Sequence, residues 1–179
     1  MEQYRTEEEQ VEALKKWWEE NGRSTMVAII VALGLGFGWQ GWLKYQQNEL
    51  EGASNSYQSM LQKLSAEDNQ GAAALAAELK QEFSRSTYAQ FAALHLARIA
   101  VNEGDLATAE AELRWVLGRS DKGSDTMQLA QLRLARVLAS GGDTGQALTI
   151  LDSADPGAYA AAYQVARGDI LLLEGRDAE

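Results

Sequence analysis

The feature that most constrains this chain is a run of twenty residues without a charged side chain, from position 24 to position 43. A helix of that length rises about 30 Å, which matches the hydrocarbon thickness of a bilayer. Four of the five tryptophans lie just before the run or near its end. Amphipathic aromatic rings prefer the headgroup level of a membrane. The pattern therefore predicts a transmembrane helix over residues 24–43.

Two other structures share this pattern. A buried core helix can be equally apolar, but such helices usually have fewer than about 18 residues. A cleavable signal peptide would end in a small-x-small site, whereas this run ends in Trp39, Gln40, Gly41 and Trp42. We therefore interpret the segment as an uncleaved membrane anchor.

The distribution of basic residues predicts the orientation of this anchor. Four of them precede the run: Arg5, Lys15, Lys16 and Arg23. After the run, Lys44 stands alone until Lys63. The positive-inside rule therefore predicts a single-pass protein with residues 1–23 in the cytoplasm and residues 44–179 across the membrane.

The segment before the anchor, residues 1–23, has the pattern of a short amphipathic helix. Thr6 and Glu9 fit a capping box, and Gly22 is placed to end the helix. One face is apolar, with Val11, Leu14 and Trp18. We expect this helix to lie on the bilayer surface with its tryptophans inserted; the alternative is a cytoplasmic docking peptide.

Small residues form two rows along the predicted anchor. Gly34 and Gly38 make a G-x-x-x-G pair, and Ala28, Ala32 and Gly36 make a second row. Such rows allow another helix to approach closely in lipid. Glycine is common in membrane helices, so lateral contact through Ala32, Gly34, Gly36 and Gly38 is a hypothesis.

The rest of the chain reads as all-α. Pro156 is the single proline, and the dominant residues, alanine, leucine, glutamate and glutamine, form helices well. One pattern occurs twice with identical internal spacing, as a small residue, a glycine and an alanine. Its two instances are Ala97, Gly104, Ala109 and Ala135, Gly142, Ala147.

Helix packing explains this spacing. A small residue lets a second helix cross the first closely, and glycine ends the first helix because it accepts the left-handed conformation. Further instances are Gly71 with Ala76 on the N-terminal side and Gly168 with Gly175 on the C-terminal side. The number of residues from Gly71 to Gly104 equals the number from Gly142 to Gly175. The distance along the sequence from Gly104 to Gly142 is longer. The extra length in the middle falls in a loop at residues 118–126.

These steps lie close to the tetratricopeptide period of about 34 residues. They favour a right-handed, tetratricopeptide-like solenoid over residues 44–179. Alanine-rich helical hairpins that are not true repeats are the alternative. The last repeat is incomplete, with an apolar row at residues 170–173, so we expect the natural protein to continue beyond Glu179.

Composition excludes several functional classes. There is no cysteine, and His95 is the single histidine, so disulfides, thiol chemistry and a histidine-based zinc site are not expected. The net charge of -10 excludes a nucleic-acid surface. No catalytic or phosphate-binding motif occurs in a suitable context. We expect no cofactor and no enzymatic activity; an unrecognised carboxylate site would need a closed pocket.

Tetratricopeptide arrays bind partners through a concave surface made largely by the first helix of each pair. Basic, aromatic and amide side chains on these helices stand out in an acidic protein. The predicted contact residues are Tyr88, Phe91, His95, Arg98, Gln128, Gln131, Arg133, Arg136, Tyr159, Tyr163 and Arg167, with Gln90 beside them. For Trp115, we expect packing between repeats; a surface anchor is the alternative.

Several of these elements occur together in one known family. The matching segments are Ala13-Leu14-Lys15-Lys16-Trp17-Trp18, Asn21-Gly22, the glycine-rich anchor, Tyr45-Gln46-Gln47 and Leu94-His95-Leu96-Ala97. Over essentially its whole length the chain resembles the YfgM-like family, the ancillary subunits of the bacterial Sec translocon.

This resemblance implies a location and a role. The family sits in the bacterial inner membrane with its repeats in the periplasm, and associates with the SecYEG channel and the membrane chaperone PpiD. It is thought to help pass secreted proteins to periplasmic chaperones. No catalytic residues carry over. A scaffold of another envelope assembly, or a protein that binds a stress-response regulator, remains the alternative.

Overall fold

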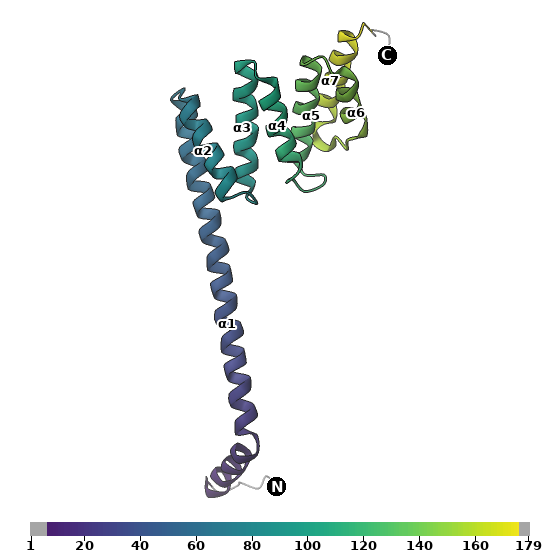
Figure 1. Ribbon diagram of the computed structural model, residues 1–179. Coiled ribbons are helices and arrows are strands. Elements are labelled where there is room, and N and C mark those ends of the chain that lie inside the picture. Colours follow the sequence, from purple (N-terminus) through teal and green to yellow (C-terminus); the bar gives the residue numbers. More distant parts are fainter. Residues whose placement is uncertain (1–6, 176–179) are drawn as a thin grey trace. The chain divides into compact units, whose positions relative to one another are not determined.

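The computed structural model describes residues 7–175, and the regular structure of these residues is entirely helical. The chain divides into an N-terminal unit, Met1–Asn48, and a C-terminal unit, Glu49–Glu179. The helices, labelled in Figure 1, are α1 (Glu7–Ser65), α2 (Asn69–Glu82), α3 (Thr87–Glu103), α4 (Leu106–Leu117), α5 (Asp125–Ser140), α6 (Thr144–Ser153), the 3-10 helix η1 (Gly157–Tyr159) and α7 (Ala160–Leu173).

In the N-terminal unit, Gly22 does not end a separate helix as predicted. It lies inside α1, which is helical from Glu7 to Ser65 and bends sharply near its N-terminal end (Figure 1). Gly22 is buried beneath the Trp18 ring, and a Cβ atom there would lie 3.1 Å from Trp18 Cε2. Its role is therefore steric, since it makes room for an indole one turn away. The predicted cap at Thr6 lies outside the described residues.

The segment of α1 predicted to cross a membrane exposes its apolar side chains. Among the described residues, α1 is the one helix long and apolar enough to span a bilayer, and its most apolar stretch has no buried residue. The exposed fraction reaches 71% at Leu35 and Phe37. Water does not favour so large a contiguous apolar surface, which marks a lipid or partner contact.

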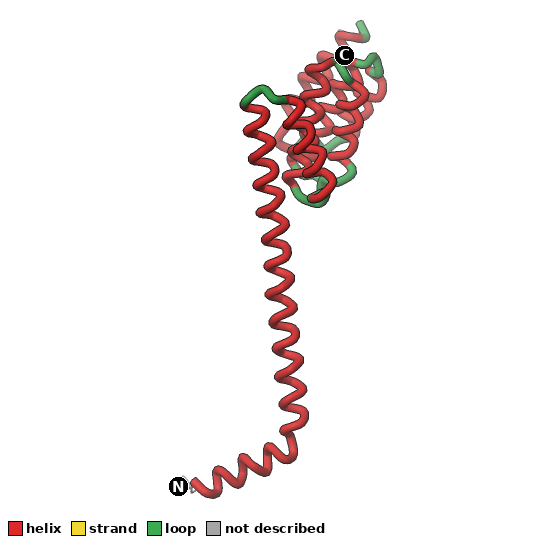
Figure 2. Tube along the Cα trace, turned by 60° about the vertical axis from the view of Figure 1, so that its left-hand side comes forward, coloured by secondary structure: helices red, strands yellow, loops and turns green. Residues whose placement is uncertain are grey.

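The C-terminal unit is a stack of helix pairs. The end of α1 pairs with α2, α3 with α4, and α5 with α6, and α7 packs on both α5 and α6. Short loops join these helices, so neighbours run antiparallel (Figure 2). The first helices α3 and α5 also contact each other. This arrangement confirms the predicted all-α repeat fold.

The turns inside the second and third pairs have the predicted geometry. Gly104 and Gly142 adopt the left-handed conformation, with φ of 78° and 92°. The next residue, Asp105 or Asp143, caps the following helix by accepting a hydrogen bond from its backbone. Glycine therefore ends one helix and aspartate starts the next. Two hydrogen bonds with Thr108 lower the pKa of Asp105, which keeps this cap charged.

The first pair departs from the prediction at Gly71. This glycine lies in the first turn of α2, where a Cβ atom would overlap the Asp68 carboxylate. The left-handed position belongs to Glu67, with φ of 58°, and Asp68 is the cap. The first step of the repeat therefore runs from Asp68 to Asp105, longer than the predicted step from Gly71 to Gly104 and nearly equal to the next step, from Asp105 to Asp143.

Alanines make the close contacts between paired helices. Ala72, Ala109 and Ala147 occupy equivalent positions in α2, α4 and α6, and each is at most 1% exposed. Ala97 and Ala135 face them from the first helices, and both are buried. These small side chains allow the close crossing that the sequence spacing predicts.

Trp115 joins the two parts of this core. Its ring packs against the cluster formed by α1, α2 and α3 and against the larger cluster that extends to α7. Lys80 Nζ lies 4.9 Å from the ring centre, and the Arg119 guanidinium carbon lies 4.1 Å from it. Lys80 also forms a largely buried ion pair with Glu112 of α4. The predicted packing role of Trp115 is therefore confirmed.

A pair of glycine variants tests the turn geometry. Gly104→Ala forces alanine into the left-handed region and should lower the free energy of unfolding by about 1–2 kcal/mol. Gly118→Ala is the matched control, because Gly118 follows α4 with φ of -70° and a Cβ atom there would make only ordinary contacts, the nearest at 3.7 Å. Urea unfolding of the full chain in detergent should show no loss for this control. Equal losses would contradict the assigned turn.

Enlarging one alanine tests the close crossing. Ala109→Leu should destabilise the repeats by about 1–3 kcal/mol, because its position is fully buried and α3 and α4 must move apart. Ala111→Leu, two residues along the same helix and exposed, should change stability by less than about 0.5 kcal/mol. Far-UV circular dichroism during urea unfolding measures both. Tolerance of Ala109→Leu would refute a tight α3–α4 contact.

Candidate functional site

Aromatic side chains from α1 and α3 meet on one face of the C-terminal unit. The Tyr57 ring lies 5.6 Å from the Tyr88 ring and 6.1 Å from the rings of Phe91 and His95. All four side chains are partly buried, so each also offers some surface to solvent. The structure thus brings three of the predicted contact residues together around Tyr57. We call these four residues the aromatic cluster.

The aromatic cluster is uncharged near neutral pH. Tyr57 Oη and His95 Nε2 lie 3.2 Å apart and share a hydrogen bond whose direction depends on the histidine tautomer. Burial lowers the pKa of His95, and the positive charges of Arg98 and Arg133 lower it further. Burial raises the pKa of Tyr57. Both groups are therefore neutral at pH 7.

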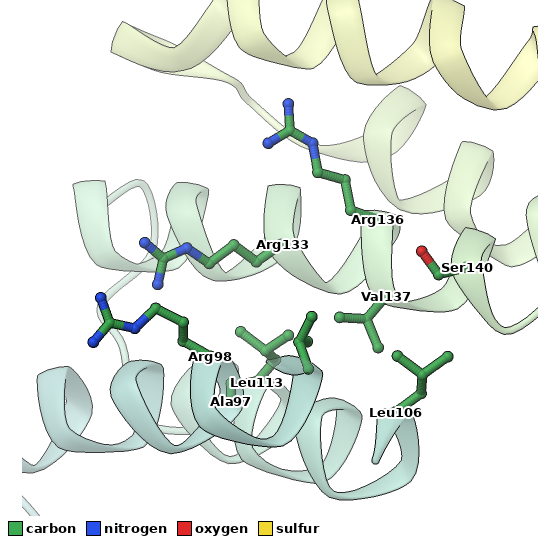
Figure 3. A pocket seen from close by; sticks show the side chains of 9 residues that line it. Ala97, Arg98, Leu106, Leu113, Arg133, Arg136, Val137 and Ser140 are labelled. Carbon is green, nitrogen blue, oxygen red and sulfur yellow. The ribbon is translucent and has the colours of Figure 1, made fainter. Parts of the chain in front are cut away.

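A cleft lies beside this cluster, between α3, α4 and α5. It has a volume of about 310 Å³. Three arginines and one serine accompany an apolar lining, as Figure 3 shows. We call it the arginine cleft; its residues are Ala97, Arg98, Val101, Leu106, Leu113, Arg133, Arg136, Val137 and Ser140.

The arginines of this cleft come from consecutive first helices. Arg98 lies on α3, and Arg133 and Arg136 lie on α5. The side chains of Arg98 and Arg133 extend in the same direction in Figure 3. Burial lowers the pKa of Arg133, and the charge of Arg98 lowers it further. Two guanidinium groups therefore repel each other at one end of the cleft.

No carboxylate balances these charges within the described part of the chain. The ion pairs there join Lys63 to Asp68, Lys80 to Glu112, Arg114 to Glu110 and Arg167 to Asp152. None of them includes Arg98, Arg133 or Arg136. The cleft is therefore a local positive site in a chain whose net charge is -10.

Two predicted contact residues serve the fold instead. Tyr163 and Gln128 are only 3% and 5% exposed. Tyr163 Oη donates a hydrogen bond of 2.8 Å to the Gln128 carbonyl oxygen and lies 3.3 Å from Gln131 Oε1, which ties α7 to α5. Gln128 Nε2 donates to the Gly123 carbonyl of the preceding loop. Their burial removes Gln128 and Tyr163 from the contact surface.

Gln90 has the same structural role one repeat earlier. It is 9% exposed, and its amide binds the loop after α4. Gln90 Nε2 donates to the Arg119 carbonyl, and Ser120 Oγ donates to Gln90 Oε1. These side chains close the turns between repeats, so they are not free to bind a partner.

The remaining predicted residues lie near α7. Arg167 pairs with Asp152 at 3.1 Å and lines a separate hollow with Pro156 and Tyr163. Tyr159 ends η1 and packs partly buried against the core. Gln131 is partly buried on α5. Neither Tyr159 nor Arg167 lines the arginine cleft, although Tyr159 lies close enough to Arg133 to interact with it electrostatically.

The small residues of the anchor are all open. Ala32, Gly34, Gly36 and Gly38 are exposed on α1, and a Cβ atom at any of the three glycines would meet nothing within 4 Å. These glycines fill no packing need within the chain. Whether another helix packs on them stays a hypothesis.

Tyr57 is the member of the aromatic cluster that the pattern missed. It lies on α1, the first helix of the first pair, and precedes His95 by one residue more than the step from Asp68 to Asp105. Assigning the turn to Gly71 hid this relation. The evenly spaced caps Asp68, Asp105 and Asp143 carry the signal that would have found it.

The chemistry available is that of binding. The described residues contain no group of three or more His, Cys, Asp or Glu side chains that could hold a metal ion. The aromatic cluster offers uncharged rings, and the arginine cleft offers positive charge over an apolar floor. Rings and guanidinium groups are the side chains that most often anchor protein interfaces.

Comparison with known proteins agrees with this architecture. The family model of the tetratricopeptide repeat-like domain matches residues 15–179. No solved structure matches significantly.

Three curated relatives share one name, ancillary SecYEG translocon subunit. The protein of Haemophilus influenzae is 32% identical over 94% of this chain and 82% of its own length. The protein of Escherichia coli is 32% identical over 98% of this chain and 84% of its own length. The protein of Aggregatibacter actinomycetemcomitans is 31% identical over 94% of this chain and 82% of its own length. The chain therefore belongs to the tetratricopeptide repeat-like family of ancillary SecYEG translocon subunits.

Proposed function

We propose that this protein is a non-catalytic scaffold, anchored in the bacterial inner membrane at the Sec translocon. One observation carries the proposal. An exposed segment of α1 that has no charged side chain and is long enough to span a membrane is joined to a repeat unit with an accessible aromatic and arginine surface. One part suits lipid, and the other suits protein. The shared name of the three relatives supports the translocon as the site of action.

The proposed topology puts residues 1–23 in the cytoplasm, residues 24–43 in the bilayer and the repeats in the periplasm. The four basic residues before the anchor support this orientation. Gly34 and Gly38, on an open face of the helix, suit contact with a membrane partner such as a SecYEG subunit.

The repeats would act on the far side of the membrane. There they would bind a PpiD-like membrane chaperone, periplasmic chaperones or secreted clients, and help hand secreted proteins onward. The contact residues proposed for this role are Tyr57, Tyr88, Phe91, His95, Arg98, Arg133 and Arg136, which remain partly or fully exposed after folding.

Cysteine labelling tests the topology, because the chain has no cysteine of its own. Lys122→Cys, in the exposed loop after α4, should react with a membrane-impermeant maleimide in intact spheroplasts. Glu12→Cys, before the anchor, should react only after the membrane is permeabilised. The reverse result would place the repeats in the cytoplasm.

Photo-crosslinking in membranes tests the partners. A photo-reactive residue at Gly34 should crosslink to translocon subunits, and one at Val101, 42% exposed in the cleft, should crosslink to chaperones or clients. Ala111, exposed on α4, is the control position and should give weaker products. Products with other envelope proteins, and none with the translocon from either position, would refute the assigned complex.

A further inference from the structure

The arginine cleft combines two features that select one kind of ligand. Its floor is made of aliphatic side chains, including Val101, Leu106 and Val137, which gain from covering by an apolar group. Its rim carries Arg98, Arg133 and Arg136, whose planar groups bind carboxylates through paired hydrogen bonds. An apolar or a purely acidic ligand would satisfy only one of these features.

Two other arginines of the unit have carboxylate partners, whereas none of the three cleft arginines pairs with a carboxylate of the described residues. Arg114 and Arg167 on neighbouring helices each hold a carboxylate, at 2.7 Å and 3.1 Å. Arg98 and Arg133 instead face each other's positive charge. A carboxylate bound between them would replace this repulsion with two attractions. The cleft is thus arranged for an anionic group that no residue of the described part of the chain supplies.

We propose that the arginine cleft binds an acidic peptide segment of a partner protein. Carboxylates of the segment pair with Arg98 and Arg133, and an apolar side chain beside them covers the floor at Val101 and Val137. This proposal rests on the proposed scaffold function, and names the partner chemistry that its repeat surface recognises. The whole chain, with these arginines included, has a net charge of -10, so its overall field disfavours acidic peptides and the positive cleft is the surface that suits one.

A labelled model peptide tests the proposal with the full chain in detergent. The probe is a short fluorescent peptide in which aspartate and glutamate alternate with leucine. Fluorescence anisotropy should show binding that weakens as salt is added, because part of the attraction is screened. The same peptide with asparagine and glutamine in place of the acids should bind much more weakly. Equal binding of the two peptides would overturn the proposal.

Single substitutions locate the site. Arg98→Gln and Arg133→Gln should each raise Kd for the acidic peptide up to about 5-fold, the size expected for one partly exposed ion pair. Arg85→Gln is the matched control, since Arg85 is exposed outside the cleft and makes the same change in net charge. Circular dichroism confirms that each variant is folded. An equal effect of Arg85→Gln would show binding to overall charge and would overturn the assignment.

The single histidine gives a second readout. Burial lowers the pKa of His95, and the charges of Arg98 and Arg133 lower it further, so a carboxylate bound to the arginines should raise that pKa in an NMR titration. An unchanged titration of His95 with the peptide bound would place the peptide elsewhere. Binding to phosphatidylglycerol vesicles without binding to the peptide would show that the cleft takes a lipid headgroup, which also overturns the proposal.

The two proposals fail in different ways. Crosslinks from Gly34 report on the membrane helix and do not involve the cleft. If they reach the translocon while the acidic peptide does not bind, the scaffold stands and the peptide site falls. If the peptide binds and translocon crosslinks are absent, the proposed peptide site is supported and the proposed location at the translocon is refuted.

Discussion

The close crossing of paired helices is the constraint on which the repeat unit depends. Ala72, Ala109 and Ala147 have no side chain beyond Cβ, so each second helix can lie directly against its partner. The turn before each second helix fixes the angle of that approach. Because these crossings set where α3 and α5 lie on either side of α4, they also set the width of the arginine cleft.

The sequence predicted the turns correctly where the backbone conformation requires a particular type of residue. Gly104 and Gly142 adopt positive φ, which glycine accepts at little cost, so the pattern located both turns. In the first pair, Glu67 adopts φ of 58°, and no residue pattern predicts a glutamate in the left-handed conformation. The true step of the first repeat, from Asp68 to Asp105, was hidden because Gly71 offered a competing glycine.

Contact residues were harder to predict than helices. A polar side chain on a first helix can point to solvent or into the turn between repeats, and spacing along one helix does not separate these directions. Gln90 and Gln128 occupy equivalent positions in successive repeats, and both donate to backbone carbonyls of the loop between α4 and α5. From the sequence alone, an amide side chain that binds a loop of its own chain cannot be distinguished from one that is free to bind a partner protein. Arg98 and Arg136 are exposed, as expected for guanidinium groups, which are rarely buried without a partner, and their contact role stays a prediction.

Charge placement, more than net charge, decides what the repeats can attract. The chain has 26 acidic and 16 basic residues, so acids are abundant, yet none of those with a described ion pair is paired with a cleft arginine. Asp105 and Asp143 accept backbone hydrogen bonds at helix starts, and Glu112 is held by Lys80. The carboxylates thus serve turns and second helices, and the cleft formed by Arg98 and its neighbours is left positive. A scaffold built in this way repels acidic proteins over most of its surface and accepts their carboxylates at one place, which turns a common charge into a selective contact.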